Sequence, residues 1–327
     1  MSLPSFQLLR PRTLDETIGF LAKHAGDVKI VAGGTDLLPS MKQKLFTPSH
    51  VLDLRGVAEL RGIHGSNDGI AIGALTTLSA LEHSSLVRRD YPVLHEAVRT
   101  VASPVIRNMA TLGGNICLDT RCLWYNQSLT WRKSCGFCLK KDGDLCHVAP
   151  GGKFCWATFS GDTPPALLCL DAELEIAGPA GTKRMALRDF YVNDGIVRHQ
   201  LASDEIITCV FLPRSAAGWR GSYQKLRVRG SIDYPLAAVA VALKMDARAG
   251  TVTDARVAIT AVNPAPQLVK EAESHVVGTS SRGDAAEEIG VLAARTAKPL
   301  TTSALTPEYR REMVRILTKR AVQAATN

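Results

Sequence analysis

The stretch Lys29-Ile30-Val31-Ala32-Gly33-Gly34-Thr35-Asp36 decides how this chain is organised. Its apolar run stops at two glycines, which a hydroxyl and a carboxylate follow. The pattern predicts a strand over residues 28–32 that enters a tight turn, where glycine leaves the main-chain amides uncovered. Uncovered amides that follow one another in a turn form a concave site for an anion such as phosphate.

A second stretch, Thr111-Leu112-Gly113-Gly114-Asn115-Ile116, repeats this chemistry. A single Gly-Gly pair is often no more than a turn. Two turns with the same flanking pattern favour one extended anionic ligand that is held from two sides. A dinucleotide such as FAD meets that requirement.

Hydrophobic periodicity predicts an α+β fold with α/β-type subdomains. Thr13 and Glu16 have the spacing of a capping box at the start of a helix. The predicted strands cover residues 6–10, 28–32, 51–54, 70–73, 167–176, 183–187, 206–212, 235–245 and 251–262, and the main predicted helices cover 14–22, 37–45, 93–102 and 307–325.

A shift in composition after Pro213, to Gly218, Trp219 and Gly221, predicts a domain boundary near residue 215. We expect an N-terminal FAD-binding subdomain over residues 1–56 and a second one over 57–215. An irregular cysteine-rich insertion, residues 117–160, interrupts the second subdomain. Residues 216–327 are expected to form a C-terminal α/β domain with a hairpin sheet and helices.

The composition is that of an ordinary globular protein, with a mean hydropathy of +0.03. A net charge of +8 permits nucleic-acid binding, but the cations are spread along the chain without a basic stripe or interleaved aromatic residues. No apolar run approaches the ~20 residues that cross a bilayer, and the first residues do not resemble a signal peptide. We therefore expect a cytoplasmic protein with neither a nucleic-acid nor a membrane partner.

Six of the eight cysteines lie within residues 117–160. Without a secretory signal, metal ligation is a better interpretation of such thiols than disulfides. A zinc ribbon uses two short Cys-x-x-Cys pairs, which only Cys135 and Cys138 match here, and a [4Fe–4S] cluster takes four thiolates with variable spacing. Spacing alone leaves an iron–sulfur cluster, zinc and unligated thiols open.

The same insertion is rich in basic residues. A local excess of cations would steer an acidic electron-carrier protein towards a redox centre, or would compensate the negative charge of a cluster. The residues concerned are Arg121, Arg132, Lys133, Lys140, Lys141 and Lys153, against Asp119, Asp142 and Asp144.

Taken in order, these motifs resemble the FAD-binding medium subunit of the molybdenum hydroxylase family, which includes xanthine dehydrogenase and carbon monoxide dehydrogenase. The resemblance covers nearly the whole chain and implies the PCMH/vanillyl-alcohol-oxidase-like FAD-binding fold. The matching segments are residues 31–36, 72–74, 77–78, 106–108, 110–116 and 161–165, with Lys225, Arg227 and Asp233 extending the match.

The cysteine insertion is absent from most of the family and is similar to that of the β subunit of 4-hydroxybenzoyl-CoA reductase. This resemblance favours a [4Fe–4S] cluster over zinc. It implies Cys122, Cys138, Cys146 and Cys155 as the ligands and leaves Cys135 spare, although the sequence alone does not separate Cys135 from Cys138.

The resemblance also implies an electron-transfer subunit without a catalytic residue for the substrate. A ferredoxin would supply electrons through the cluster and FAD to [2Fe–2S] and molybdenum centres on partner subunits. There the phenolic hydroxyl of 4-hydroxybenzoyl-CoA is removed, in anaerobic degradation of aromatic compounds. The implied assembly is a heterohexamer, a dimer of heterotrimers with a molybdopterin-binding large subunit and a [2Fe–2S] small subunit.

By correspondence with the family, two segments should hold the FAD pyrophosphate. Asp162 should accept hydrogen bonds from ribityl or ribose hydroxyls, Val101 and Ile207 should pack against flavin or adenine, and Lys225 should lie near the isoalloxazine. The pyrophosphate segments are Lys29, Ile30, Val31, Ala32, Gly33, Gly34, Thr35 and Asp36, and Thr111, Gly113, Gly114 and Asn115.

Two other functions remain open at this point. A stand-alone FAD oxidoreductase that uses NAD would carry structural zinc in the cysteine insertion. A zinc-containing nucleic-acid-binding module fits the basic pI of about 9.1 but leaves both glycine pairs unexplained.

Overall fold

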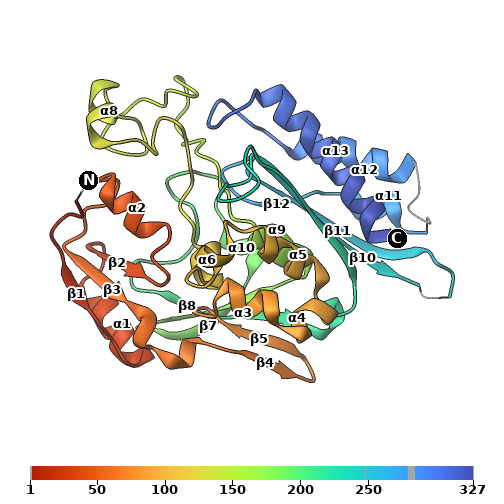
Figure 1. The fold of residues 1–327 in the computed structure, drawn as a ribbon, viewed down its shortest axis with the longest axis horizontal. Helices are drawn as coiled ribbons and strands as arrows, with labels where there is room; N and C mark the ends of the chain where they lie inside the picture. Colours follow the sequence, from red (N-terminus) through yellow and green to blue (C-terminus); the bar gives the residue numbers. More distant parts are fainter. Residues whose placement is uncertain (1, 247, 279–283, 327) are drawn as a thin grey trace.

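The computed structural model describes residues 2–246, 248–278 and 284–326. Figure 1 shows three sheets that follow one another along the chain, with the cysteine insertion above the first of them. The fold mixes helices and sheets, as the sequence predicts. Within the described ranges, no helix is both long and apolar enough to cross a bilayer.

The first sheet is parallel, with the strand order β1-β3-β2. Its helix α1 begins at the predicted cap, because Thr13 Oγ1 accepts from the Glu16 amide at 3.1 Å. The Glu16 carboxylate accepts from the Arg12 amide, one residue before the position that a capping box uses. The elements are β1 (Gln7–Leu9), α1 (Leu14–Lys23), β2 (Val28–Val31), α2 (Leu37–Lys42) and β3 (His50–Asp53).

The second sheet is antiparallel and has the order β4-β5-β8-β6-β7. Its buried face and the surrounding helices share one core, which includes Ile72, Leu174 and Val210. The strands are β4 (Ile63–Ser66), β5 (Gly69–Gly73), β6 (Glu173–Gly178), β7 (Gly181–Ala186) and β8 (Ile206–Pro213). The helices are α3 (Leu78–His83), α4 (Ser85–Asp90), α5 (Pro92–Thr100), α6 (Pro104–Arg107), α7 (Leu112–Ile116), α9 (Thr163–Cys169) and α10 (Leu187–Phe190), with short 3-10 turns η1 (Leu54–Gly56), η2 (Ala58–Leu60) and η3 (Arg214–Ala216).

The third sheet is antiparallel, in the order β12-β11-β10-β9, and is covered by helices on both faces. Strand β10 alternates small and large side chains, so its alanines allow α5 and α9 to pack closely on one face. Val239, Val241 and Leu243 face the core beneath α12 and α13. The elements are β9 (Arg220–Leu226), β10 (Ala237–Met245), β11 (Val252–Thr260), β12 (Gln267–Leu268), α11 (Ala272–Val276), α12 (Asp284–Thr296) and α13 (Pro307–Thr326).

The cysteine insertion is mostly irregular, as predicted, but contains the short helix α8 (Leu129–Ser134). Arg132 of α8 is buried and donates to the main-chain oxygens of Gln43 and Lys44, just beyond α2. Tyr125 and Cys138 pack against Leu45 in the same region. The insertion is therefore anchored on the segment that follows the first glycine turn.

Two predicted elements are wrong. The predicted strand over residues 167–176 is helix α9 followed by β6, because Pro164 and Pro165 fit the first turn of a helix. The second glycine pair lies inside α7 rather than in a tight turn, because Thr111 caps that helix.

Candidate functional site: a dinucleotide cavity beside a cluster of cysteines

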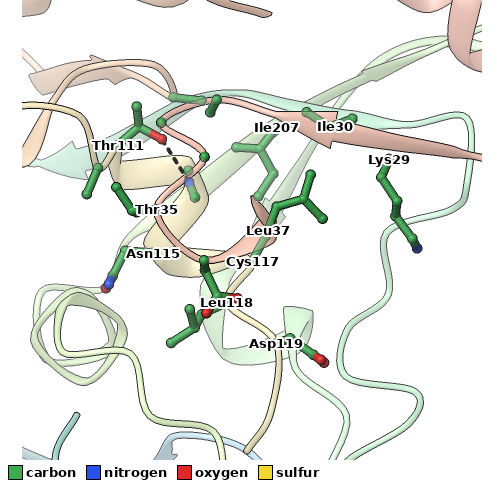
Figure 2. Close-up of a pocket in the computed structure, with 18 of the residues that line it drawn as sticks. Lys29, Ile30, Thr35, Leu37, Thr111, Asn115, Cys117, Leu118, Asp119 and Ile207 are labelled. Carbon is green, nitrogen blue, oxygen red and sulfur yellow. Dashed lines mark hydrogen bonds between the residues drawn. The ribbon is translucent and has the colours of Figure 1, made fainter. Parts of the chain in front are cut away.

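A cavity of about 610 Å³ is lined by residues from the region of the first sheet, from the region of the second sheet, and from the segment 232–234 of the C-terminal part. Figure 2 shows side chains of β2, the first glycine turn, α7 and β8 around it. All the residues predicted to hold FAD line this cavity except Val31 and Lys225. Val31 instead packs into a small core with Met41 and Val51.

The predicted first turn forms, and its main-chain amides are available to a ligand. Among the described residues, none accepts a hydrogen bond from the amides of Gly33, Gly34, Thr35 or Asp36. Gly34 has a φ of +71°, which favours glycine. Main-chain amides without partners inside a cavity are costly unless a ligand accepts from them, so this turn fits a phosphate group.

The second glycine pair does not supply bare amides, which corrects the prediction. The Gly113 amide donates to Ala74 O at 2.9 Å, and the Gly114 amide donates to Thr111 Oγ1 at 3.2 Å (Figure 2). Gly113 allows close packing, because an added Cβ would lie 2.9 Å from the Ala74 Cβ. Asn115 is fixed through its Oδ1, which accepts from the Thr163 amide and hydroxyl.

Lys225, predicted to lie near the isoalloxazine, is one residue removed from the cavity wall. Its Nζ lies 3.0 Å from Asp162 Oδ2 and donates to Thr100 O, and both charged side chains are almost fully buried. The other carboxylate oxygen of Asp162 accepts from Tyr223. Asp162 lines the cavity, whereas Lys225 does not, so Lys225 acts on the cavity by holding that carboxylate.

We expect Lys225→Met to lower the free energy of unfolding by about 3–5 kcal/mol, because it leaves a buried carboxylate without its countercharge. Urea denaturation measures this change. The double variant Lys225→Met/Asp162→Asn removes both charges and should recover much of the loss. A single variant as stable as the wild type would contradict the role of this ion pair.

Sequence reasoning missed several cavity residues. Tyr234 donates to Asp36 at 3.0 Å, while Arg121 pairs with the same carboxylate at 2.8 Å and stacks on the tyrosine ring. Burial lowers the pKa of His199 to about 4, and burial with nearby Arg198 lowers the pKa of Lys29. These contacts join segments far apart in the sequence, and no local motif marks them.

Four cysteines line a second, smaller cavity: Cys122, Cys138, Cys146 and Cys155. Cys135 does not line it, because Gly136 and Phe137 have φ values of +77° and +62° and reverse the chain between Cys135 and Cys138. Burial raises the pKa of Cys122 and that of Cys155 to about 11. Across the described ranges, no three Cys, His, Asp or Glu side chains stand close enough to hold a metal ion, so the thiols are gathered but do not form a preformed metal site.

Four of the six basic residues of the insertion are paired or buried rather than free on its surface. Arg121 pairs with Asp36, Arg132 is buried beside α2, and Lys140 pairs with Asp119. Lys133 and Lys153 are exposed, and Lys141 pairs with Asp142 at 3.1 Å. Exposed apolar residues share this surface: Leu123, Leu129, Trp131, Leu145 and Phe154.

The first glycine turn and the cavity are suited to an anionic ligand, and the comparisons identify the class of protein. Residues 4–215 match the FAD binding domain in molybdopterin dehydrogenase, and residues 221–325 match the CO dehydrogenase flavoprotein C-terminal domain. The chain belongs to the family of FAD-binding medium subunits of the molybdenum hydroxylases.

Two relatives and one solved structure illustrate this membership. The carbon monoxide dehydrogenase medium chain of Afipia carboxidovorans is 31% identical over 98% of this chain and 96% of its own length. The aldehyde oxidoreductase FAD-binding subunit of Escherichia coli (strain K12) is 33% identical over 78% of this chain and 81% of its own length. A crystal structure of the Cu,Mo-CO dehydrogenase superposes with a TM-score of 0.82 at 29% identity, covering 100% of this chain and 99% of that chain.

Proposed function

We propose that this chain is the FAD- and [4Fe–4S]-containing electron-transfer subunit of a molybdenum enzyme of the 4-hydroxybenzoyl-CoA reductase type. The observation that carries the proposal is the set of four cysteines around one cavity, in an insertion anchored on the FAD-binding turn. FAD connects one-electron and two-electron chemistry, so a subunit that binds it can serve between single-electron centres and a two-electron reaction.

The residues that would hold FAD follow from the cavity. The four unpaired amides from Gly33 to Asp36 would donate to the pyrophosphate, and Ile207 and Val101 offer apolar surface to the rings. Asp162 would accept from sugar or ribityl hydroxyls while Lys225 and Tyr223 fix its orientation. Gly113 and Gly114 shape the opposite wall rather than donate their amides to a ligand, since both amides already donate within the chain.

The four thiols suit an iron–sulfur cluster better than zinc. A single zinc ion requires four sulfurs at about 2.3 Å from one centre, which demands close convergence. A cube of four irons and four sulfides spreads its thiolate ligands farther apart. Four thiols around one cavity supply the full ligand set of such a cluster, and the similarity of the insertion to that of the 4-hydroxybenzoyl-CoA reductase β subunit favours the cluster over zinc.

The partners in this proposal are a molybdopterin-binding large subunit, a [2Fe–2S] small subunit and a ferredoxin donor. Lys133 and Lys153 are exposed near Trp131 and Phe154 on the cysteine insertion. Cations beside apolar side chains would suit an acidic electron carrier.

Analysis of protein purified without oxygen tests the proposal. We expect the purified protein to contain FAD and about four iron and about four sulfide per chain. We also expect a molybdopterin subunit to co-purify with it. One zinc without sulfide would favour a stand-alone flavoprotein with a structural zinc loop. A protein with FAD but neither metal would overturn the cluster.

We expect Gly195→Ala to disturb the cluster and to leave FAD bound. An added Cβ would lie 2.7 Å from Cys155 Sγ and 3.0 Å from the Ala157 amide nitrogen, so Cys155 must move. Iron content per chain should fall at least about twofold as the ligand geometry is lost. Gly151→Ala is the matched control, because no atom lies within 4 Å of its added Cβ; equal iron in both variants would contradict the role of Cys155.

A further inference from the structure

One buried cation lies between the cysteine cavity and the FAD cavity. Lys140 lines the cysteine cavity, and its side chain is 7% exposed. Its Nζ donates to Asp119 Oδ1 at 2.8 Å, Gly195 O at 2.9 Å and Thr120 O at 3.1 Å, and it also contacts Thr120 Oγ1. These oxygens accept hydrogen bonds, which is the arrangement that an ammonium group requires.

One partner of Lys140 lines the FAD cavity, and another is hydrogen-bonded to a cysteine of the cysteine cavity. Asp119 lines the FAD cavity and is 9% exposed at its side chain (Figure 2). Gly195 lies beside Cys155, which lines the cysteine cavity: its amide donates to Cys155 O at 2.8 Å, and a Cβ added to it would lie 2.7 Å from Cys155 Sγ. Lys140 therefore joins the main chain beside a cysteine to a carboxylate beside the FAD cavity.

We propose that Lys140 is a positioning residue whose buried positive charge raises the reduction potential of the cluster, and that Asp119 tempers this effect from the FAD side. The inference rests on the proposed function, since it requires the cluster. A buried charge acts more strongly than an exposed one, because the interior screens it poorly. Reduction adds negative charge, so a nearby cation favours the reduced cluster.

The role of Lys140 is tested by potentiometry of the anaerobically purified complex, in which the spectrum of the reduced cluster reports the extent of reduction. Lys140→Met should shift the one-electron reduction equilibrium at least tenfold towards the oxidised cluster, which is about 59 mV in potential. Lys141→Met removes the same charge from a half-exposed pair with Asp142 and should shift the potential much less. Equal shifts in the two variants would overturn the proposal.

Asp119→Asn should shift the reduction potential of the cluster in the direction opposite to Lys140→Met. It leaves Lys140 without its countercharge, so the potential of the cluster should rise. If the Lys140→Met protein loses its iron, the Asp119→Asn protein alone tests the proposal. An unchanged or lowered cluster potential in the Asp119→Asn protein overturns the role of Lys140. A wild-type protein without iron and sulfide would instead overturn the proposed function.

Discussion

Replacing Gly33 with alanine is expected to yield a destabilised protein that does not retain FAD. The added Cβ would lie 2.0 Å from the Met109 carbonyl oxygen and 2.6 Å from its carbon. Both are main-chain atoms that cannot rotate away. The glycine turn must therefore move away from the main chain at Met109 and Ala110. Overpacking usually costs about 1–3 kcal/mol, and we expect at least about 3 kcal/mol here. Urea denaturation and FAD absorbance per chain measure the two effects.

Gly19→Ala is the control for this substitution. No atom lies within 4 Å of its added Cβ, and the residue is exposed in α1. Alanine at such a position should stabilise the helix by about 0.5–1 kcal/mol and leave FAD content unchanged. A Gly33→Ala protein with full FAD content and wild-type stability would show that the two walls do not pack as described.

Replacing Cys146 with alanine is expected to abolish the broad visible absorbance of the cluster while FAD remains bound. Cys146 is buried and lines the cysteine cavity, so its loss removes one of four proposed ligands. Iron should fall from about four per chain to near zero, because three thiolates no longer hold the cube securely. FAD should remain because the cysteine side chains do not contribute to its glycine turn.

Cys135→Ala is the matched control, since this thiol lies in the same insertion but outside the cavity. It should keep wild-type iron and sulfide. The ligand assignment would be wrong if Cys135→Ala lost the cluster and Cys138→Ala kept it. Loss of FAD together with iron in Cys146→Ala would mean that the insertion is integral to the flavin site.

Local signals predicted most of the elements around the cavity. The helix cap at Thr13 and the turn at Gly33 and Gly34 form where the local motifs indicate them, and the long helix α13, away from the cavity, forms where the periodicity indicates it. The second glycine pair misled the prediction, because a threonine cap converts it into the start of a helix. The buried ion pair of Lys225 was also missed, because its partner lies far away in the sequence.

The sequence by itself determined the α+β class, the family motifs, the first glycine turn and the presence of a cysteine-rich insertion. These features depend on neighbouring residues, through periodicity, glycine conformation and helix capping. Only the tertiary structure decided that Cys138 rather than Cys135 shares a cavity with the other three cysteines, which basic side chains are buried in ion pairs, and which carboxylates line the larger cavity. Those outcomes depend on long-range packing and burial, because an ion pair such as Lys140 with Asp119 forms only when separate segments exclude water around it.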